Sequence, residues 1–440
     1  MAASGTIHEE QRLGVLDGLR GIAVLLVLWY HVWEISWLSA QPNSLEFLPE
    51  TGFVGVLLFF FLSGFVITYP FERGVRGQGR MPTWGHFAWR RFTKIMPSYV
   101  LSIVVAYAIG YAQKQPDASP LPDVTTHLLF IHTWFLDRYG TINGVLWTLA
   151  VEVEFYCVFP LVWWGFRRQP WLVAGAMIAI AWAWRVWQYT CCYGTTFGSY
   201  EENLPGYLDI FAFGMLSAYL FVRFGDRIRT TAAKYAAPVL AIAGIVMAVV
   251  LLKNLYDFRF VDSWAGVWQV HRRPLLGAAF ALVALGSLWA PWRWKMLLSN
   301  PPLRFLATFS YNLYLYHQMV ARELLARHIP PYIGNDIHDD PRAEVTYTYV
   351  AFAATIVQAT IVTYLFERPL LRIPPPRRVR GEDGVLRWTW SLKRSEEAPL
   401  PKPPSRWVSS RSLRVRRSTA RLRQFEEPPA IRRVPRSSKP

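Results

Sequence analysis

Ten long apolar stretches dominate this sequence of 440 residues. A helix needs about 20 predominantly apolar residues to cross the hydrocarbon core of a bilayer. Only 18% of the residues are charged, below the roughly 25% of soluble proteins. We therefore predict an all-α polytopic membrane protein with about ten transmembrane helices. The predicted crossings are 15–38, 51–71, 95–113, 145–166, 170–190, 205–222, 234–252, 274–290, 305–326 and 344–366.

Basic loops orient these helices, because loops rich in Lys and Arg remain in the cytoplasm. Loop 72–94 carries six such residues, and further ones follow the fourth and sixth crossings and precede the ninth. Loop 253–273 departs from the pattern with four. The distribution predicts a multi-pass protein of the cell inner (cytoplasmic) membrane with both termini in the cytoplasm. Segment 125–137 is apolar but too short to span, so we expect a reentrant or interfacial segment on the outer side.

The formal net charge of +17 is unevenly distributed. Residues 368–440 hold 20 Lys and Arg against 6 Asp and Glu, a net charge of +14, which leaves +3 for the rest. Strong basicity in a soluble chain would suggest a nucleic-acid partner, but here the charge belongs to an appended tail, so we expect no such partner. We divide the chain into a short cytoplasmic N-terminus (1–12), a transmembrane domain (13–370) and a basic tail (371–440).

The basic tail contains IPPPRR and PLPKPP and shows no helical or strand period. This composition is typical of a disordered segment. A cytoplasmic segment of this charge can lie on anionic membrane lipids, and it can also contact other proteins.

Asp17, Arg20 and His31 are among the ionisable residues of the first predicted helix, where an uncompensated charge costs at least about 2.5 kcal/mol. Asp17 and Arg20 are three residues apart and can pair on one face. Arg20 and His31 share a face but lie about 16 Å apart along the axis, so they cannot grip one reacting atom in a straight helix.

Glu152 lies at a depth similar to that of His31, about two turns from the outer end of its own helix. A histidine can take a proton from a hydroxyl group and return one. A carboxylate on its other ring nitrogen would fix the tautomer. His31 could instead be a structural histidine, but Arg20 and Glu152 in matching places favour a catalytic role.

The closely spaced histidines His127 and His132 do not indicate a metal site. His127 and His132 are one residue further apart than the i,i+4 spacing of metal-binding helices, and no carboxylate lies between them. We expect no metal.

Five fragments in order resemble the acyltransferase 3 family of membrane acyltransferases: LDGLRGIAVLLVLWYH, FFFLSGFVIT, RRFTKIMPSY, LWTLAVEVEFY and SYNLYLYHQ. The resemblance covers about residues 13–370, with FERPL closing it. It implies transfer of an acyl group from acyl-CoA, with acetyl-CoA the expected donor, to a hydroxyl of a cell-envelope glycan, a glycolipid or a small glycosylated molecule. It implies no permanently bound cofactor. Some relatives carry an additional hydrolase-like domain, which we do not expect here.

The resemblance also assigns roles to residues. The family's Arg-x10-His motif falls on Arg20 and His31, and its acidic motif falls on Glu152. His31 is then the expected general base, oriented by Glu152. The basic cytoplasmic motif falls on Arg91 and Lys94, where Lys keeps the charge but lacks the planar fork of Arg.

Donor binding is expected at a cytoplasmic basic rim of Arg90, Arg91 and Lys94, because a CoA donor carries phosphates. A double displacement through an acyl-enzyme on Ser63 or His31 is the second mechanism considered. We expect Glu367 and Arg368 to form an interfacial pair. Supporting roles near the site are expected for Asp17, Ser63, Tyr156 and His317.

A transporter is the alternative function, because transporters also use intramembrane Arg, His and Glu residues. Transporters often contain inverted repeats with broken helices. We find no convincing internal repeat, so the sequence favours the enzyme.

Overall fold

The computed structural model describes residues 2–36, 45–112, 119–192, 202–258, 265–334, 336–371, 373, 377–380 and 386–389. The chain separates into two units, Met1–Pro375 and Pro376–Pro440.

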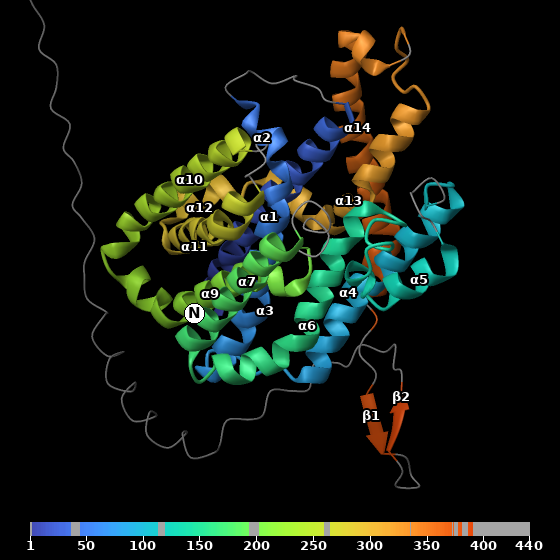
Figure 1. Ribbon diagram of the computed structural model, residues 1–440. Coiled ribbons are helices and arrows are strands. Elements are labelled where there is room, and N and C mark those ends of the chain that lie inside the picture. The colour runs from blue at the N-terminus through green and yellow to red at the C-terminus, as the bar shows by residue number, and fades with distance from the viewer. Residues whose placement is uncertain are drawn as a thin grey trace, which may run out of the picture. The chain divides into compact units, whose positions relative to one another are not determined.

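Helices build the first unit (Figure 1). The longer helices are α1 (Ala2–Ser36), α3 (Gly55–Val75), α4 (Trp84–Ala108), α6 (Trp147–Phe166), α7 (Pro170–Cys192), α9 (Leu208–Thr230), α10 (Ala233–Phe258), α11 (Arg273–Trp289), α13 (Pro301–Ala326) and α14 (Pro341–Val362). The shorter ones are α2 (Phe47–Glu50), η2 (Gly52–Val54), α5 (Pro120–Leu128), η4 (His132–Trp134), η5 (Gly144–Leu146), η6 (Leu204–Tyr207), η7 (Ala265–Arg272), α12 (Trp292–Leu298), η8 (Ile337–Asp339), η9 (Thr363–Glu367) and α15 (Arg368–Leu371).

Seven of the described helical segments are long and apolar enough to cross a membrane. All seven coincide with predicted crossings, which confirms the prediction of an all-α polytopic membrane protein. The other three predicted crossings fall on α4, α11 and α13. Of these, α11 has 17 residues, and α4 and α13 carry many of the polar residues of the site described below. The seven segments are Gly14–Ile35, Gly52–Val75, Gly144–Phe166, Pro170–Cys191, Leu204–Ile228, Ala233–Asp257 and Pro341–Leu371.

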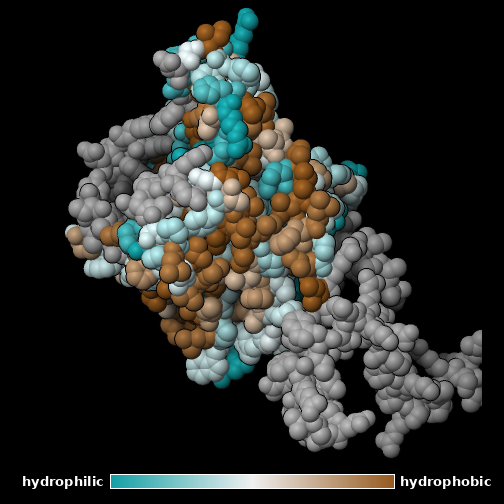
Figure 2. Space-filling model, turned by 90° about the vertical axis from the view of Figure 1, so that its right-hand side faces the viewer, coloured by the Kyte–Doolittle hydropathy of each residue, from teal (hydrophilic) through white to brown (hydrophobic). Residues whose placement is uncertain are grey.

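Large apolar side chains face outward along the peripheral helices. On α10 they include Val239, Ile242 and Val246, and on α14 they include Val357 and Ile361. Figure 2 shows hydrophobic side chains gathered across the middle of the visible face, with hydrophilic ones toward both ends. This arrangement is the one that a bilayer would stabilise, because lipid then covers the apolar belt.

Two glycines bring α3 and α9 into close contact at the centre of the bundle. A Cβ atom at Gly64 would collide with the carbonyl of Phe211, and one at Gly214 would collide with the carbonyl of Phe61. Small residues at helix crossings allow this approach in membrane proteins. The contact holds α3 in place, and α3 carries Ser63 into the site.

Polar caps begin two of the helices that frame the site. The side chain of Thr83 accepts from the backbone N–H of His86 at the start of α4. Asn300 accepts from the N–H of Leu303 at 2.9 Å, before two prolines in the first turn of α13. These residues satisfy N–H groups that a helix start leaves free.

The segment predicted to be reentrant folds as α5 and η4, joined through Phe130 in the left-handed region at φ 56°. The rings of His127 and His132 stack face to face within it, with centroids 3.8 Å apart and planes 7° apart. Both side chains are fully buried. Burial lowers the pKa of His127 to about 4, and burial beside His127 holds the pKa of His132 well below its usual value.

The basic tail contains a short antiparallel hairpin, β1 (Arg377–Arg380) with β2 (Leu386–Thr389). Arg377 lies opposite Thr389, and Arg380 lies opposite Leu386. This corrects the prediction that the tail has no strand structure. Each strand has only four residues, too few to stand out in the sequence as a period of two. The remainder of the tail prediction lies outside the described residues.

Candidate active site

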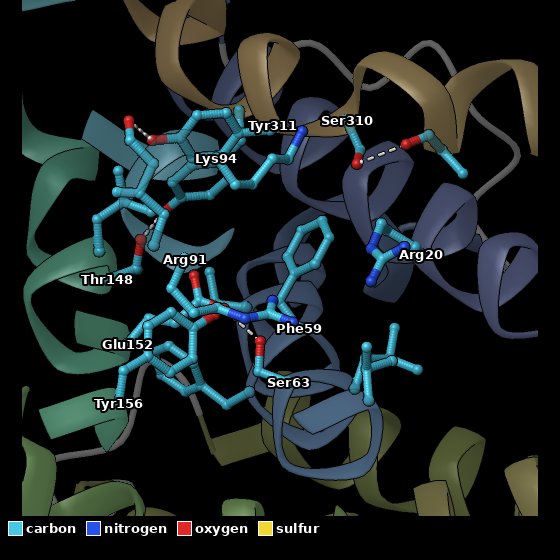
Figure 3. Close-up of a pocket in the computed structure, with 18 residues that line it drawn as sticks. Arg20, Phe59, Ser63, Arg91, Lys94, Thr148, Glu152, Tyr156, Ser310 and Tyr311 are labelled. Atoms are coloured by element: carbon cyan, nitrogen blue, oxygen red, sulfur yellow. Dashed lines mark hydrogen bonds between the residues drawn. The ribbon is translucent and has the colours of Figure 1, made fainter. Parts of the chain in front are cut away.

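A cavity of roughly 200 Å³ lies within the bundle, where α1, α3, α4, α6 and α13 meet (Figure 3). Its walls combine three cationic side chains, one carboxylate, hydroxyl groups and apolar side chains. The lining residues are Arg20, Val56, Phe59, Phe60, Leu62, Ser63, Val66, Arg91, Lys94, Ile95, Thr148, Leu149, Glu152, Tyr156, Ala307, Ser310, Tyr311 and Tyr314.

Glu152 joins two walls of this cavity. Its Oε1 accepts hydrogen bonds from the hydroxyl of Ser63 on α3 and from the hydroxyl of Tyr156, one turn further along α6. A carboxylate that accepts two hydroxyl protons is held in one orientation and can draw a proton from either group. Three residues predicted from the sequence are thus brought together.

The cationic residues of the cavity come from two helices, as Figure 3 shows for Arg20 on α1 and for Arg91 and Lys94 on α4. Arg20 pairs with Asp17 at 3.3 Å, as the i,i+3 spacing predicted. The guanidinium of Arg91 lies 5.5 Å from the ring centroid of Tyr156, within the range of a cation–π interaction.

Lys94 does not stand alone in the cavity wall. Its Nζ forms an ion pair with Glu367 at the end of the π-helical turn η9. The other oxygen of Glu367 accepts from Asn312 on α13. Glu367 is only 2% exposed. The prediction of an interfacial Glu367–Arg368 pair is therefore wrong for Glu367, which pairs inward with α4 instead.

His31 pairs with His317 rather than with Glu152. Nδ1 of His31 lies 2.9 Å from Nε2 of His317 and 3.0 Å from the carbonyl oxygen of Val27. Nδ1 of His317 lies 2.6 Å from the carbonyl oxygen of Tyr314. The hydrogen bonds of Glu152 in the described residues go to α3 and α6, so the orienting partner expected for His31 differs from the one found.

The two carbonyl oxygens fix the protons of the histidine pair. A carbonyl oxygen only accepts, so Nδ1 carries the proton in both rings. Nε2 of His317 is then an acceptor. The Nδ1–H of His31 is shared between this nitrogen and the carbonyl oxygen of Val27. The lone pair of His31 therefore lies on Nε2, which is the arrangement that a general base requires.

Tyr314 connects the cavity to the histidine pair. Its side chain lines the cavity, its carbonyl accepts from His317, and its hydroxyl accepts from Thr148 at 2.9 Å. His31 itself is not among the lining residues. Tyr314 thus contacts both the cavity, through its side chain, and the histidine pair, through its carbonyl oxygen.

The remaining predicted residues fall outside the cavity wall. Arg90 is exposed on α4 and is not a lining residue. Asp17 lines a neighbouring pocket together with Arg304. Within the described residues, no group of three or more His, Cys, Asp or Glu side chains is placed to hold a metal ion.

Sequence reasoning missed Tyr314 and Glu367 as members of this site, and it considered His317 only for a supporting role. The resemblance included the segments that contain YLYHQ and FERPL. Which side chains of these segments meet, however, depends on the rotation of each helix about its axis. That rotation is set by packing between segments far apart in the chain.

Comparisons with known proteins agree on one family. A family model described as "Acyltransferase domain" matches residues 13–367. The peptidoglycan O-acetyltransferase OatA of Listeria monocytogenes is 26% identical over 336 residues, which cover 71% of this chain and 50% of that protein. The acyltransferase MdmB of Streptomyces mycarofaciens is 29% identical over 181 residues, 38% of this chain and 45% of that protein.

Putative O-acetyltransferases of Staphylococcus aureus are 22% identical over 333 residues, with 69% of this chain and 49% of those proteins covered. The chain thus spans about half the length of the curated relatives it matches. No solved structure matches the chain.

Proposed function

The chain belongs to the acyltransferase domain family, and on that premise we propose that it is a membrane O-acetyltransferase that uses acetyl-CoA. The acceptor in this proposal is a hydroxyl group of an envelope glycan, a glycolipid or a small glycosylated molecule. The proposal also assigns the protein to the inner membrane with both termini in the cytoplasm. Its relatives, which include a peptidoglycan O-acetyltransferase, support acetyl as the group transferred.

One observation carries this proposal: Tyr314 contacts both a cationic cavity and a histidine pair with a free Nε2 lone pair. The cavity supplies positive charge for the phosphates of a donor. The histidine supplies a base for the hydroxyl of an acceptor. Because Tyr314 contacts both, a donor in the cavity and an acceptor at His31 would lie close together, as a transfer between two substrates requires.

The donor is proposed to enter from the cytoplasmic half, where Arg20, Arg91 and Lys94 lie. Arg20 and His31 are eleven residues apart on α1, so about 16 Å separates them along the helix axis. An extended pantetheine arm can cover this distance. The phosphates would then remain with the cations while the thioester reaches the level of Tyr314.

Direct transfer is the proposed chemistry. Nε2 of His31 takes the proton of the acceptor hydroxyl, and the hydroxyl oxygen attacks the thioester carbonyl carbon. The carbon–sulfur bond breaks, and the leaving thiolate takes the proton from His31. His317 holds the His31 ring through Nδ1–H, so it is a positioning residue in this scheme.

A double displacement would use Ser63 and Glu152 instead. The hydroxyl of Ser63 already donates to Glu152 inside the cavity, so Glu152 could take its proton as the Ser63 oxygen attacks the thioester carbon. The carbon–sulfur bond breaks, and the leaving CoA thiolate takes the proton from Glu152. The acetyl group would then pass from Ser63 to the acceptor. Mass spectrometry after a single turnover without acceptor distinguishes the routes, because only this one leaves an acetyl group on Ser63.

The test of the proposed function is release of free CoA by the purified full-length protein in detergent, with acetyl-CoA and a panel of glycan acceptors. We expect His31→Ala to abolish acceptor-dependent release. His86→Ala removes an exposed histidine at the start of α4 and serves as the matched control, with full activity. Unchanged release in His31→Ala would rule out His31 as the general base.

A further inference from the structure

A second polar cluster lies beyond the cavity, around η6 and the adjoining ends of α7 and α11. Asn203 and Gln188 are both 0% exposed. Neither amide nitrogen nor amide oxygen of either side chain has a hydrogen-bond partner in the described structure. The Oε2 atom of Glu202 is also buried and without a partner there. The proposed reaction uses none of these three residues.

Unpartnered amides of this kind are costly. A buried donor or acceptor that lacks a partner destabilises the folded state by about 1–3 kcal/mol. Nearly all buried polar groups in native proteins are therefore hydrogen-bonded to protein or water. Two complete primary amides without protein partners among the described residues are therefore available for hydrogen bonds from a ligand or from buried water. Four amide atoms and a carboxyl oxygen suit a ligand that carries several donors and acceptors.

Neighbouring contacts place these groups around η6. Arg185, one turn before Gln188 on α7, donates to the carbonyl of Gly206 in η6. Residues three apart share a helix face, so Gln188 lies on the side of α7 that packs against η6. Asn203 directly precedes η6. The unpartnered amides thus belong to one region of the fold.

The cluster also adjoins the candidate active site. Glu202 interacts electrostatically with Tyr314, the residue that links the cavity to the histidine pair, and with Arg273. The ring of Tyr207 lies 5.0 Å from Phe60, a lining residue of the cavity. A ligand held at Asn203 would therefore lie near the reacting groups.

Aromatic and charged side chains complete the surroundings. The ring of Tyr207 packs 5.7 Å from Trp147 and carries the guanidinium of Arg273 at 4.6 Å. Burial raises the pKa of Glu202 to about 8, against the opposing effect of Arg273. The neutral acid that this favours can donate a hydrogen bond as well as accept one. Aromatic rings with a few fixed polar groups are typical of small-molecule sites.

We propose that Gln188, Glu202 and Asn203 form the acceptor subsite, which binds the hydroxyl and acetamido groups of an N-acetylated sugar in a glycan. The amides match an acetamido group, which presents one N–H donor and one carbonyl acceptor. The subsite rests on the proposed acetyltransferase function for its role as acceptor site, but its binding of sugar can be measured without any transfer.

The experiment is equilibrium binding of chitotetraose, a tetramer of N-acetylglucosamine, to the full-length protein in detergent without acetyl-CoA. Cellotetraose, which lacks the acetamido groups, is the comparison ligand. We expect chitotetraose to bind at least about tenfold more tightly than cellotetraose. Asn203→Ala and Gln188→Ala should each weaken chitotetraose binding by about tenfold. Gln358→Ala removes an amide with an unpartnered Oε1 on α14 and should leave binding unchanged.

Asn203→Asp provides the same test if the alanine variant does not fold, because it keeps the size of the side chain and replaces the amide donors with a carboxyl group. Unchanged chitotetraose affinity in the Asn203 and Gln188 variants would overturn the proposal and assign the amides to buried water. Equal affinity for the two tetramers would overturn the acetamido recognition. Specific binding without acetyl transfer would instead contradict the proposed function and leave the subsite in place.

Discussion

The stacked histidines of the α5–η4 segment predict a pH-dependent opening of that segment. His127 and His132 are buried with their rings 3.8 Å apart. Nδ1 of His127 donates to the carbonyl of Asp123 at 2.8 Å, and the Asp123 carboxylate is occupied by Arg138 at 3.1 Å. The hydroxyl of Tyr99 donates to the His127 carbonyl. Burial of the ring lowers the pKa of His127 by more than the two contacts with Asp123 raise it, so the closed segment holds His127 in its neutral form.

The direction follows from linkage. The pKa of His127 is about 4 in the closed segment against 6.5 for an exposed histidine, so the opened form binds more protons between these values. Stability of the closed form is complete above pH 6.5 and is lost as pH falls toward 4. Lowering the pH from 7.5 to 5 favours opening by about 30-fold, or about 2 kcal/mol, from His127 alone. The lowered pKa of His132 acts in the same direction.

Hydrogen–deuterium exchange of peptides covering residues 120–134 measures this opening in the purified protein. Rates at pH 7.5 and pH 5 are divided by the intrinsic rates of an unstructured reference peptide. We expect protection to fall by about 30-fold or more at pH 5, and peptides from α3 serve as an internal control. The double variant His127→Gln/His132→Gln should lose the pH dependence. Equal pH dependence in this variant and the wild type would refute the reasoning.

Three further predictions concern the site and the bundle. His317→Gln should lower kcat by about 100-fold with KM for acetyl-CoA within twofold in a CoA-release assay, because only the orientation of the base is lost; an equal rise in KM would contradict a positioning role. Glu367→Gln should lower the apparent melting temperature because it leaves the charge of Lys94 without its carboxylate, and Lys94→Met in the same chain should restore part of the loss. Gly64→Ala should destabilise the protein by about 1–3 kcal/mol in a thermal-shift comparison, because the added Cβ meets the Phe211 carbonyl. Gly175→Ala is the control and should leave the stability unchanged, because its added Cβ meets no atom within 4 Å.

Hydropathy and helical periodicity were sufficient to predict most of the fold. The seven segments that are apolar enough to span a membrane were all predicted, because the length of an apolar run is set locally by the thickness of the bilayer. The helix that holds both Arg20 and His31 was predicted for the same reason, and so was the Asp17–Arg20 pair, since i,i+3 neighbours meet in any helix. Such features depend on sequence neighbours alone.

Side-chain contacts between different helices could not be predicted from sequence neighbours. Glu152 and His31 lie at matching depths, which suggested a pair, yet depth leaves the rotation of each helix open. The structure turns Glu152 toward Ser63 and Tyr156 and turns His31 toward His317. The ring nitrogen of His31 for which a carboxylate partner was predicted lies instead against a second histidine, whose own proton is fixed by a backbone carbonyl.

The pairing of Lys94 with Glu367 shows what this distinction means for the proposed donor site. The two residues are 273 positions apart, so only the packing of α4 against η9 brings them together. Before a donor arrives, Lys94 is held by Glu367 and Arg20 by Asp17, which lowers the mutual repulsion of cations that share one cavity. A phosphate that enters must therefore share Lys94 and Arg20 with their carboxylate partners. The guanidinium of Arg91, in contrast, lies over the ring of Tyr156. Arg91 is thus the cation whose charge is most available to the donor, and its planar fork suits a phosphate better than the ammonium of Lys94 does.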